Sequence, residues 1–134
     1  MKFIELEPQF VRHEIRIEKW KRVVGDPLTW KSGDPTEEVE GPCEYLPKVD
    51  TLGDAQGVMY LCPKCFAEKG GPVGCHRVLS WFRDRGITDD VSPGPGRWPV
   101  SGTCYDDLTL TGSVFLQAGC AWHGYITNGS VTSV

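Results

Sequence analysis

Two short motifs constrain this chain more than any other feature of its sequence. Cys62 and Cys65 are separated by two residues, and Cys120 and His123 repeat that spacing. A two-residue spacer lets one tight turn direct two ligand atoms at one ion, and three thiolates with one imidazole form a tetrahedral set typical of structural zinc. The two motifs stand much further apart than the roughly 15–20 residues of a compact zinc ribbon. We therefore predict one closed zinc site made from two distant, ribbon-like knuckles.

Length and composition indicate a small folded protein. The chain has 134 residues, enough for one hydrophobic core. Its first residues, MKFIELEPQF, lack the apolar block of a signal peptide, and no apolar run approaches the roughly 20 residues of a membrane-spanning helix. We expect a cytoplasmic protein with no membrane-bound part. In a reducing compartment, six cysteines are better explained as metal ligands or free thiols than as disulfides.

The pattern of short apolar runs between glycines and prolines predicts a single, mainly β, irregular domain. Residues 124–134 predict a hairpin, because Asn128-Gly129 suits a type I′ turn. The stretch 76–86 fits either a strand or a short helix. Further strands are expected on both sides of Pro8 and at 58–62 and 108–117.

The N-terminal part alternates in hydrophobicity before it becomes turn-rich. Apolar Ile15 and Ile17 share a register with His13 and alternate with charged residues, which predicts a half-buried strand. Residues 25–57 are acidic and rich in glycine and proline, and we interpret them as a long surface loop. The chain is thus divided into a β and loop segment at 1–57 and a zinc-knuckle β core at 58–134.

Cys75 and His76 are alternative metal ligands. Adjacent residues on a strand point to opposite faces, so both can bind one ion only if they lie in a turn. Either one is a candidate to replace a member of the predicted set. The simpler interpretation places Cys75 in the core and His76 on the surface.

An enzyme is the less favoured interpretation. A catalytic zinc keeps one coordination position open for water, whereas the predicted set is closed. If the protein is an enzyme, His76, Asp106 and Asp107 are the groups to test. Cys104 beside these aspartates is either a catalytic thiol or, more simply, a small buried residue before an Asp-containing turn. Cys43 lies in the acidic loop and is interpreted as a free thiol.

Net charge and aromatic content indicate what class of partner the protein binds. A formal net charge of −4 argues against a general nucleic-acid binder, although Trp20 lies among basic residues and Trp122 belongs to a knuckle able to stack a base. Interleaved glutamates indicate charge pairing between strands instead. Five tryptophans favour a packed core and an aromatic binding face, with Trp20, Trp98 and Trp122 as its candidates.

The C-terminal half resembles a known family. CHRVLSWFRDRG, followed by RWPVSGTCYDDLTLTGSVFLQAGCAWHGYITNGSV, is similar to DUF6527-type small proteins of bacteriophages and bacteria, over roughly residues 58–131. Gly112 stands where the family has a proline. Phage members are sometimes labelled ammonia monooxygenase, yet this chain has no copper-type histidine cluster for that chemistry. The resemblance implies metal positions at Cys62, Cys65, Cys120 and His123 and a strand signature at Trp98, Asp107, Leu108 and Leu110.

The resemblance also implies a setting. It points to a phage or prophage accessory protein in the host cytoplasm, or to a component of the virion. We therefore expect a structural-zinc binding module that engages a host or phage protein. The alternatives are a zinc-dependent, hydrolase-like enzyme and a nucleic-acid-binding zinc-ribbon protein.

Overall fold

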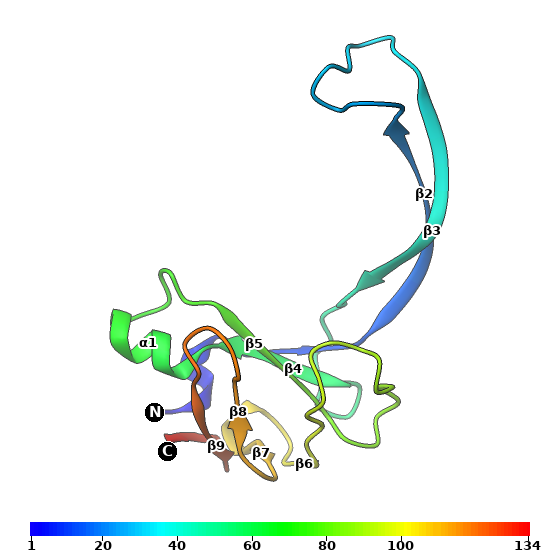
Figure 1. The fold of residues 1–134 in the computed structure, drawn as a ribbon. Coiled ribbons are helices and arrows are strands. Elements are labelled where there is room, and N and C mark those ends of the chain that lie inside the picture. The colour runs from blue at the N-terminus through cyan, green and yellow to red at the C-terminus, as the bar shows by residue number, and fades with distance from the viewer. The chain divides into compact units, whose positions relative to one another are not determined.

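The computed structural model describes all 134 residues and is mainly β, as the sequence predicts (Figure 1). The chain forms two compact units: a core unit of residues 1–12 and 47–134, and a hairpin unit of residues 13–46. The elements in chain order are η1 (Phe3–Leu6), β1 (Gln9–Val11), β2 (Glu14–Val23), β3 (Thr36–Tyr45), β4 (Gly57–Leu61), α1 (Pro63–Lys69), β5 (Arg77–Trp81), β6 (Val100–Ser101), η2 (Tyr105–Asp107), β7 (Thr109–Leu110), β8 (Val114–Phe115), β9 (His123–Thr127) and β10 (Ser130–Ser133).

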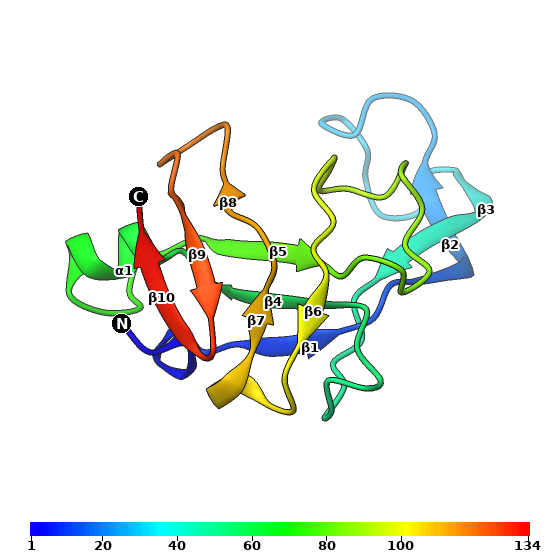
Figure 2. The same cartoon turned by 90° about the horizontal axis from the view of Figure 1, so that it is seen from below.

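The core unit contains two antiparallel three-stranded sheets and one short pair of strands. One sheet has the order β1-β4-β5 and the other β10-β9-β8, while β6 pairs with β7. In Figure 2, β9 and β10 cross the direction of β4 and β5. Residues of both sheets belong to one buried cluster, with Val58 and Tyr60 from β4 and Ile126 from β9. The two sheets therefore share one large hydrophobic cluster.

Aromatic rings fill much of this core. Phe3 meets Tyr60 edge-on with ring centroids 5.1 Å apart, and Phe10 stacks on Tyr105 at 4.3 Å. The polar atoms of these tyrosines are paired: Tyr60 shares a 2.9 Å hydrogen bond with Ser80, and the Tyr105 hydroxyl accepts one from the Phe10 backbone N–H. Each fully buried large side chain contributes about 1.5–3 kcal/mol, so this cluster supplies a large part of the unit's stability.

The predicted C-terminal hairpin is confirmed. Strands β9 and β10 pair from Thr127 opposite Ser130, and the two turn residues have positive φ, 49° at Asn128 and 72° at Gly129. Two positive φ values define the type I′ turn that the Asn-Gly pair favours. The turn is held against the rest of the unit, because the Gly129 N–H donates to the Leu108 carbonyl at 2.9 Å.

Several local expectations change in the structure. Residues 76–86, which fit either strand or helix, contain strand β5. The run at 108–117 is interrupted, with β7 and β8 separated at Gly112, whose φ is 100°. The residues before Pro8 form the 3₁₀ turn η1 instead of a strand, and α1 was not anticipated from the pattern.

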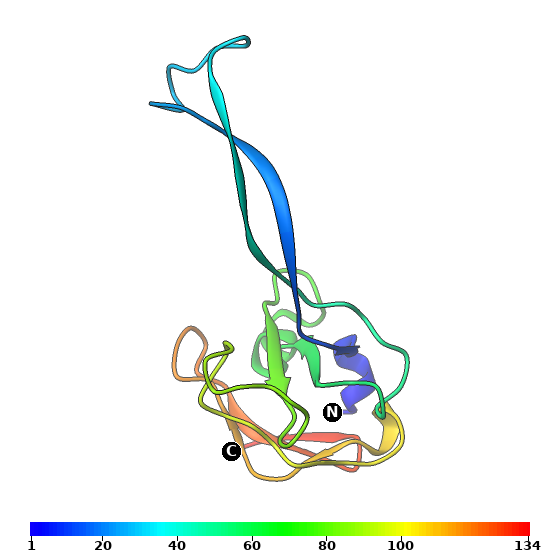
Figure 3. The same ribbon diagram turned by 90° about the vertical axis from the view of Figure 1, so that its right-hand side faces the viewer.

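The hairpin unit corrects two expectations. Residues 36–45 do not belong to a surface loop, since they form β3 and pair with β2 over ten residues (Figure 3). Strand β2 is not half-buried: Ile15 is 50% exposed and Ile17 is 64% exposed. The alternation in the sequence does report a strand, but in a two-stranded ribbon it does not imply that the apolar face is covered.

Candidate metal centre

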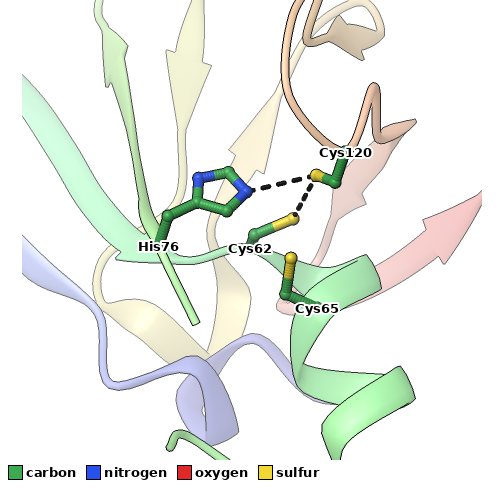
Figure 4. Close-up of side chains that lie close together, drawn as sticks. All are labelled: Cys62, Cys65, His76 and Cys120. Atoms are coloured by element: carbon green, nitrogen blue, oxygen red, sulfur yellow. Dashed lines mark hydrogen bonds between the residues drawn. The ribbon is translucent and has the colours of Figure 1, made fainter. Parts of the chain in front are cut away.

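The structure brings four potential ligands together: Cys62, Cys65, His76 and Cys120 (Figure 4). Their ligand atoms all lie within 4.8 Å of one another. With zinc–sulfur bonds of about 2.3 Å, the sulfurs of a tetrahedral site stand about 3.8 Å apart. The cluster therefore has the size and the donor types of a site that can hold a metal ion.

The cysteines in the cluster are free thiols. Cys62 Sγ lies 3.1 Å from Cys120 Sγ, much further than the about 2.05 Å of a disulfide bond. The Nε2 atom of His76 also lies 3.1 Å from Cys120 Sγ. Cys120 thus stands between a second thiol and an imidazole, which is a polar arrangement that a cation would complete.

The first pair of ligands is positioned by the junction between β4 and α1. Cys62 is the residue before the helix, and Pro63 begins the helix, where its fixed φ is compatible and its missing N–H is not needed. Backbone N–H groups of Cys65 and Lys64 donate hydrogen bonds to the Cys62 sulfur. The two-residue spacer therefore forms the knuckle that the sequence predicts, with Cys65 on the first turn of the helix.

His76 is positioned by the pairing of β4 with β5. It immediately precedes β5, and its carbonyl accepts a 2.9 Å hydrogen bond from the Cys62 N–H. Leu61 pairs with Arg77 in the same ladder, so the end of β4 and the start of β5 meet beside α1. Antiparallel pairing brings the end of one strand beside the start of the next. A prediction that β4 pairs with β5 would therefore have placed His76 beside the first knuckle.

The fourth member of the cluster therefore differs from the first expectation, which was His123. His123 is the first residue of β9, and its ring packs edge-on against Phe115 with centroids 4.9 Å apart. The preceding Trp122 is buried, and its carbonyl accepts a hydrogen bond from Leu116 N–H at 2.8 Å. Because side chains alternate along a strand, this anchoring of Trp122 turns His123 to the opposite face.

Cys75 lies outside the cluster. Its thiol donates a 3.2 Å hydrogen bond to the Gly71 carbonyl, and its side chain packs against the hydrophobic core. His76 is the member of this adjacent pair that joins the cluster. This outcome agrees with the argument that neighbouring residues entering a strand point in opposite directions.

The surroundings shift the pKa values of two of the thiols in opposite directions. Burial raises the pKa of Cys62 to about 12. At Cys120, burial also acts to raise the pKa, but hydrogen bonds from Cys62, His76 and the Trp122 N–H outweigh it and lower the pKa to about 7. Of the two thiols, Cys120 therefore loses its proton more readily than Cys62.

The three groups suggested for an enzyme do not form a catalytic arrangement. His76 belongs to the cysteine cluster, whereas the Asp107 carboxylate accepts 2.8 Å hydrogen bonds from the N–H groups of Cys104 and Thr103. These bonds, with one from the Thr103 hydroxyl, lower the pKa of Asp107 to about 2. Asp107 therefore holds the η2 turn, which is the Asp-containing turn that the simpler interpretation of Cys104 expected. Asp106 is exposed, and so is Cys104, which corrects the expectation that Cys104 is buried.

The three tryptophans considered for a binding face have different environments. Trp122 is only 2% exposed, so it is a core residue and cannot present its ring to a partner. Trp98 is half-buried, packs against the core, and donates a hydrogen bond from Nε1 to the Ser113 carbonyl. Trp20, on the hairpin unit, is 42% exposed. Cys43 lies in β3 and not in a loop.

Comparisons with protein-family models, with curated proteins and with solved structures find no match for this chain. The DUF6527-type resemblance therefore stays a prediction based on its motifs. None of the helices has both the length and the apolar character needed to cross a membrane.

Proposed function

We propose that this chain is a structural-zinc protein, in which Cys62, Cys65, His76 and Cys120 bind one zinc ion, and that it acts as a binding module. The observation that carries the proposal is the convergence of four nitrogen and sulfur donors from three separate segments. Thiolate and imidazole donors favour zinc over hard cations such as magnesium or calcium, which prefer oxygen.

A structural role is supported because the ion would connect three segments that are far apart in the sequence. The donors come from the β4–α1 junction, from the start of β5, and from the loop between β8 and β9. Most of that loop is exposed, at residues 117–119 and 121, so apolar burial contributes little to holding it. Four protein donors complete a tetrahedral set, and such sites contribute on the order of 10 kcal/mol to folding.

The competing functions have weaker support. The suggested catalytic aspartate is occupied by its own turn, through hydrogen bonds to Thr103 and Cys104. The tryptophan suggested for base stacking at the knuckle, Trp122, is buried. A protein-binding role in a phage or prophage setting is in keeping with the motif resemblance, and we retain it as part of the proposal.

Metal analysis of four variants tests the site. We expect the purified wild-type chain to contain zinc in equimolar amount, His76→Ala and Cys120→Ser to lose it, and His123→Ala and Cys75→Ser to keep it. The last two are matched controls because they remove a histidine and a cysteine close to the cluster. Substitution with Co²⁺ should add the absorption bands of a tetrahedral thiolate site.

Two results would contradict the proposal. Loss of zinc from His123→Ala with retention in His76→Ala would mean that His123 is the fourth ligand. A wild-type chain that takes up neither zinc nor cobalt would remove the metal site altogether.

A further inference from the structure

The two faces of the β2–β3 ribbon differ in chemistry. Side chains alternate along each strand, and residues paired across the ribbon lie on the same face. One face, here the Trp face, includes the pairs Arg16 with Cys43, Trp20 with Val39 and Arg22 with Glu37. The other, here the Ile face, consists of Ile15 with Glu44, Ile17 with Pro42, Lys19 with Glu40, Lys21 with Glu38 and Val23 with Thr36.

The charged side chains of the Trp face have partners within the hairpin. The Arg16 guanidinium lies 4.3 Å from the centre of the Tyr45 ring, whose hydroxyl donates a 2.8 Å hydrogen bond to Glu18. Arg22 forms an ion pair with Glu37. The charged groups of this face therefore already have partners and suit contact with water.

On the Ile face, a Glu44 carboxylate oxygen lies 3.7 Å from Nε2 of His13, but the rest of this face lacks comparable internal contacts. Ile15 and Ile17 are at least half exposed. Beyond them, two lysines from β2 lie opposite two glutamates from β3, yet none of the four forms an ion pair in the hairpin. An isolated two-stranded hairpin is at best marginally stable in water, so covering this face would stabilise the unit.

We propose that the Ile face binds the Ile face of a second copy of this chain, with a two-fold axis parallel to the strands. This rotation places β2 of one copy over β3 of the other. Lys19 then faces Glu40 of the second copy, Lys21 faces Glu38, and Ile17 faces Pro42, each contact occurring twice. A two-fold axis across the strands instead places β2 over β2, with lysines against lysines. The charge pattern therefore selects the parallel axis.

The size of the ribbon sets the strength of the contact. Ten residues at about 3.3 Å each give a length of about 33 Å, and two strands that each occupy about 4.8 Å give a width of about 10 Å, so the footprint is roughly 300 Å² per copy. Stable dimers bury about 800 Å² per partner. We therefore expect a weak dimer that exchanges rapidly and that salt weakens further, because its ion pairs lie near the surface.

Charge reversal in separate chains provides the test. Sedimentation equilibrium of the full, metal-loaded chain should show concentration-dependent dimerisation at low salt. K19E/K21E and E38K/E40K should each raise the dissociation constant about tenfold or more, whereas an equimolar mixture of the two variants should associate as a heterodimer, which an affinity tag on one chain detects. Arg22→Glu is the matched control, because it reverses a charge on the Trp face of the same strand and should leave dimerisation unchanged.

The mixing experiment also guards against misfolding. Each charge variant also loses attraction between the strands of its own hairpin, so a variant could be monomeric because its hairpin does not fold. Heterodimer formation on mixing requires folded hairpins and therefore excludes that explanation. A monomeric wild type, a dimer that survives in both variants, or the absence of heterodimer would overturn the proposal. A monomer in which the Ile15 and Ile17 side chains are shielded from a soluble paramagnetic probe would instead mean that the chain covers this face itself.

Discussion

Gly129 provides a quantitative test of how the core unit is assembled. A Cβ atom at this position would collide with the carbonyl oxygen of Asp106, and φ is 72°, in the left-handed region. The backbone around it is also engaged: Gly129 N–H donates to the Leu108 carbonyl, and its own carbonyl accepts from Phe3 N–H at 2.8 Å. A Gly129→Ala substitution therefore strains the turn and pushes η2 away from it.

The expected cost can be divided into two parts. A left-handed conformation costs alanine about 1–2 kcal/mol relative to glycine. Displacing the Asp106 carbonyl weakens two backbone hydrogen bonds, each with a net contribution of about 1 kcal/mol. Together these give up to about 3–4 kcal/mol, a large fraction of the 5–15 kcal/mol by which small domains are stable.

The control for this substitution is Gly70→Ala. Gly70 has nearly the same φ, 69°, but no atom lies within 4 Å of an added Cβ. It should therefore cost only the conformational part, about 1–2 kcal/mol. Urea unfolding of both variants measures the two costs. Equal destabilisation by the two substitutions would show that the contact between the β9–β10 turn and η2 does not contribute, and the reasoning would fail.

Three further predictions concern the metal centre and η2. Chelation should lower the melting temperature, because free zinc at 100 times its dissociation constant adds about 2.7 kcal/mol to stability; a melt unchanged by chelator would contradict a structural ion. Zinc affinity should fall as pH falls, because the ion must displace the proton of Cys62, whose pKa is raised to about 12; calorimetry in buffers of different ionisation enthalpy should detect the released protons. Asp107 has a pKa lowered from 3.8 to about 2, so its contribution is present above about pH 4 and is lost as pH falls through that interval; Asp107→Asn should destabilise the protein at neutral pH and flatten its acid unfolding curve.

The features that the sequence predicted correctly depend on neighbouring residues. The Asn128-Gly129 turn follows from two residues that tolerate positive φ. Cys62 and Cys65 form a knuckle because only the two residues between them decide its geometry. Three of the four clustered ligands are identified by such short motifs.

The fourth member of the cluster, His76, could not be identified from a short motif. Cys120-x-x-His123 has the spacing of a knuckle, but the burial of Trp122 turns the histidine away. His76 reaches the cluster through the pairing of β4 with β5, a contact that the spacing of motifs does not encode. Strand β3 was missed for a related reason: with Gly41, Pro42 and four glutamates it has the composition of a loop, and its pairing with β2 alone makes it a strand.

The separation of the ligands along the chain has a consequence for synthesis on the ribosome. Cys120 follows His76 by 44 residues and Cys62 by 58. A growing chain therefore contains three of the proposed zinc donors before the last one is made. During that interval an ion at this position would have an open coordination site, accessible to water, to glutathione or to a chaperone thiol. Cys120 would close it only after leaving the ribosome, so the loop between β8 and β9 would supply the last donor.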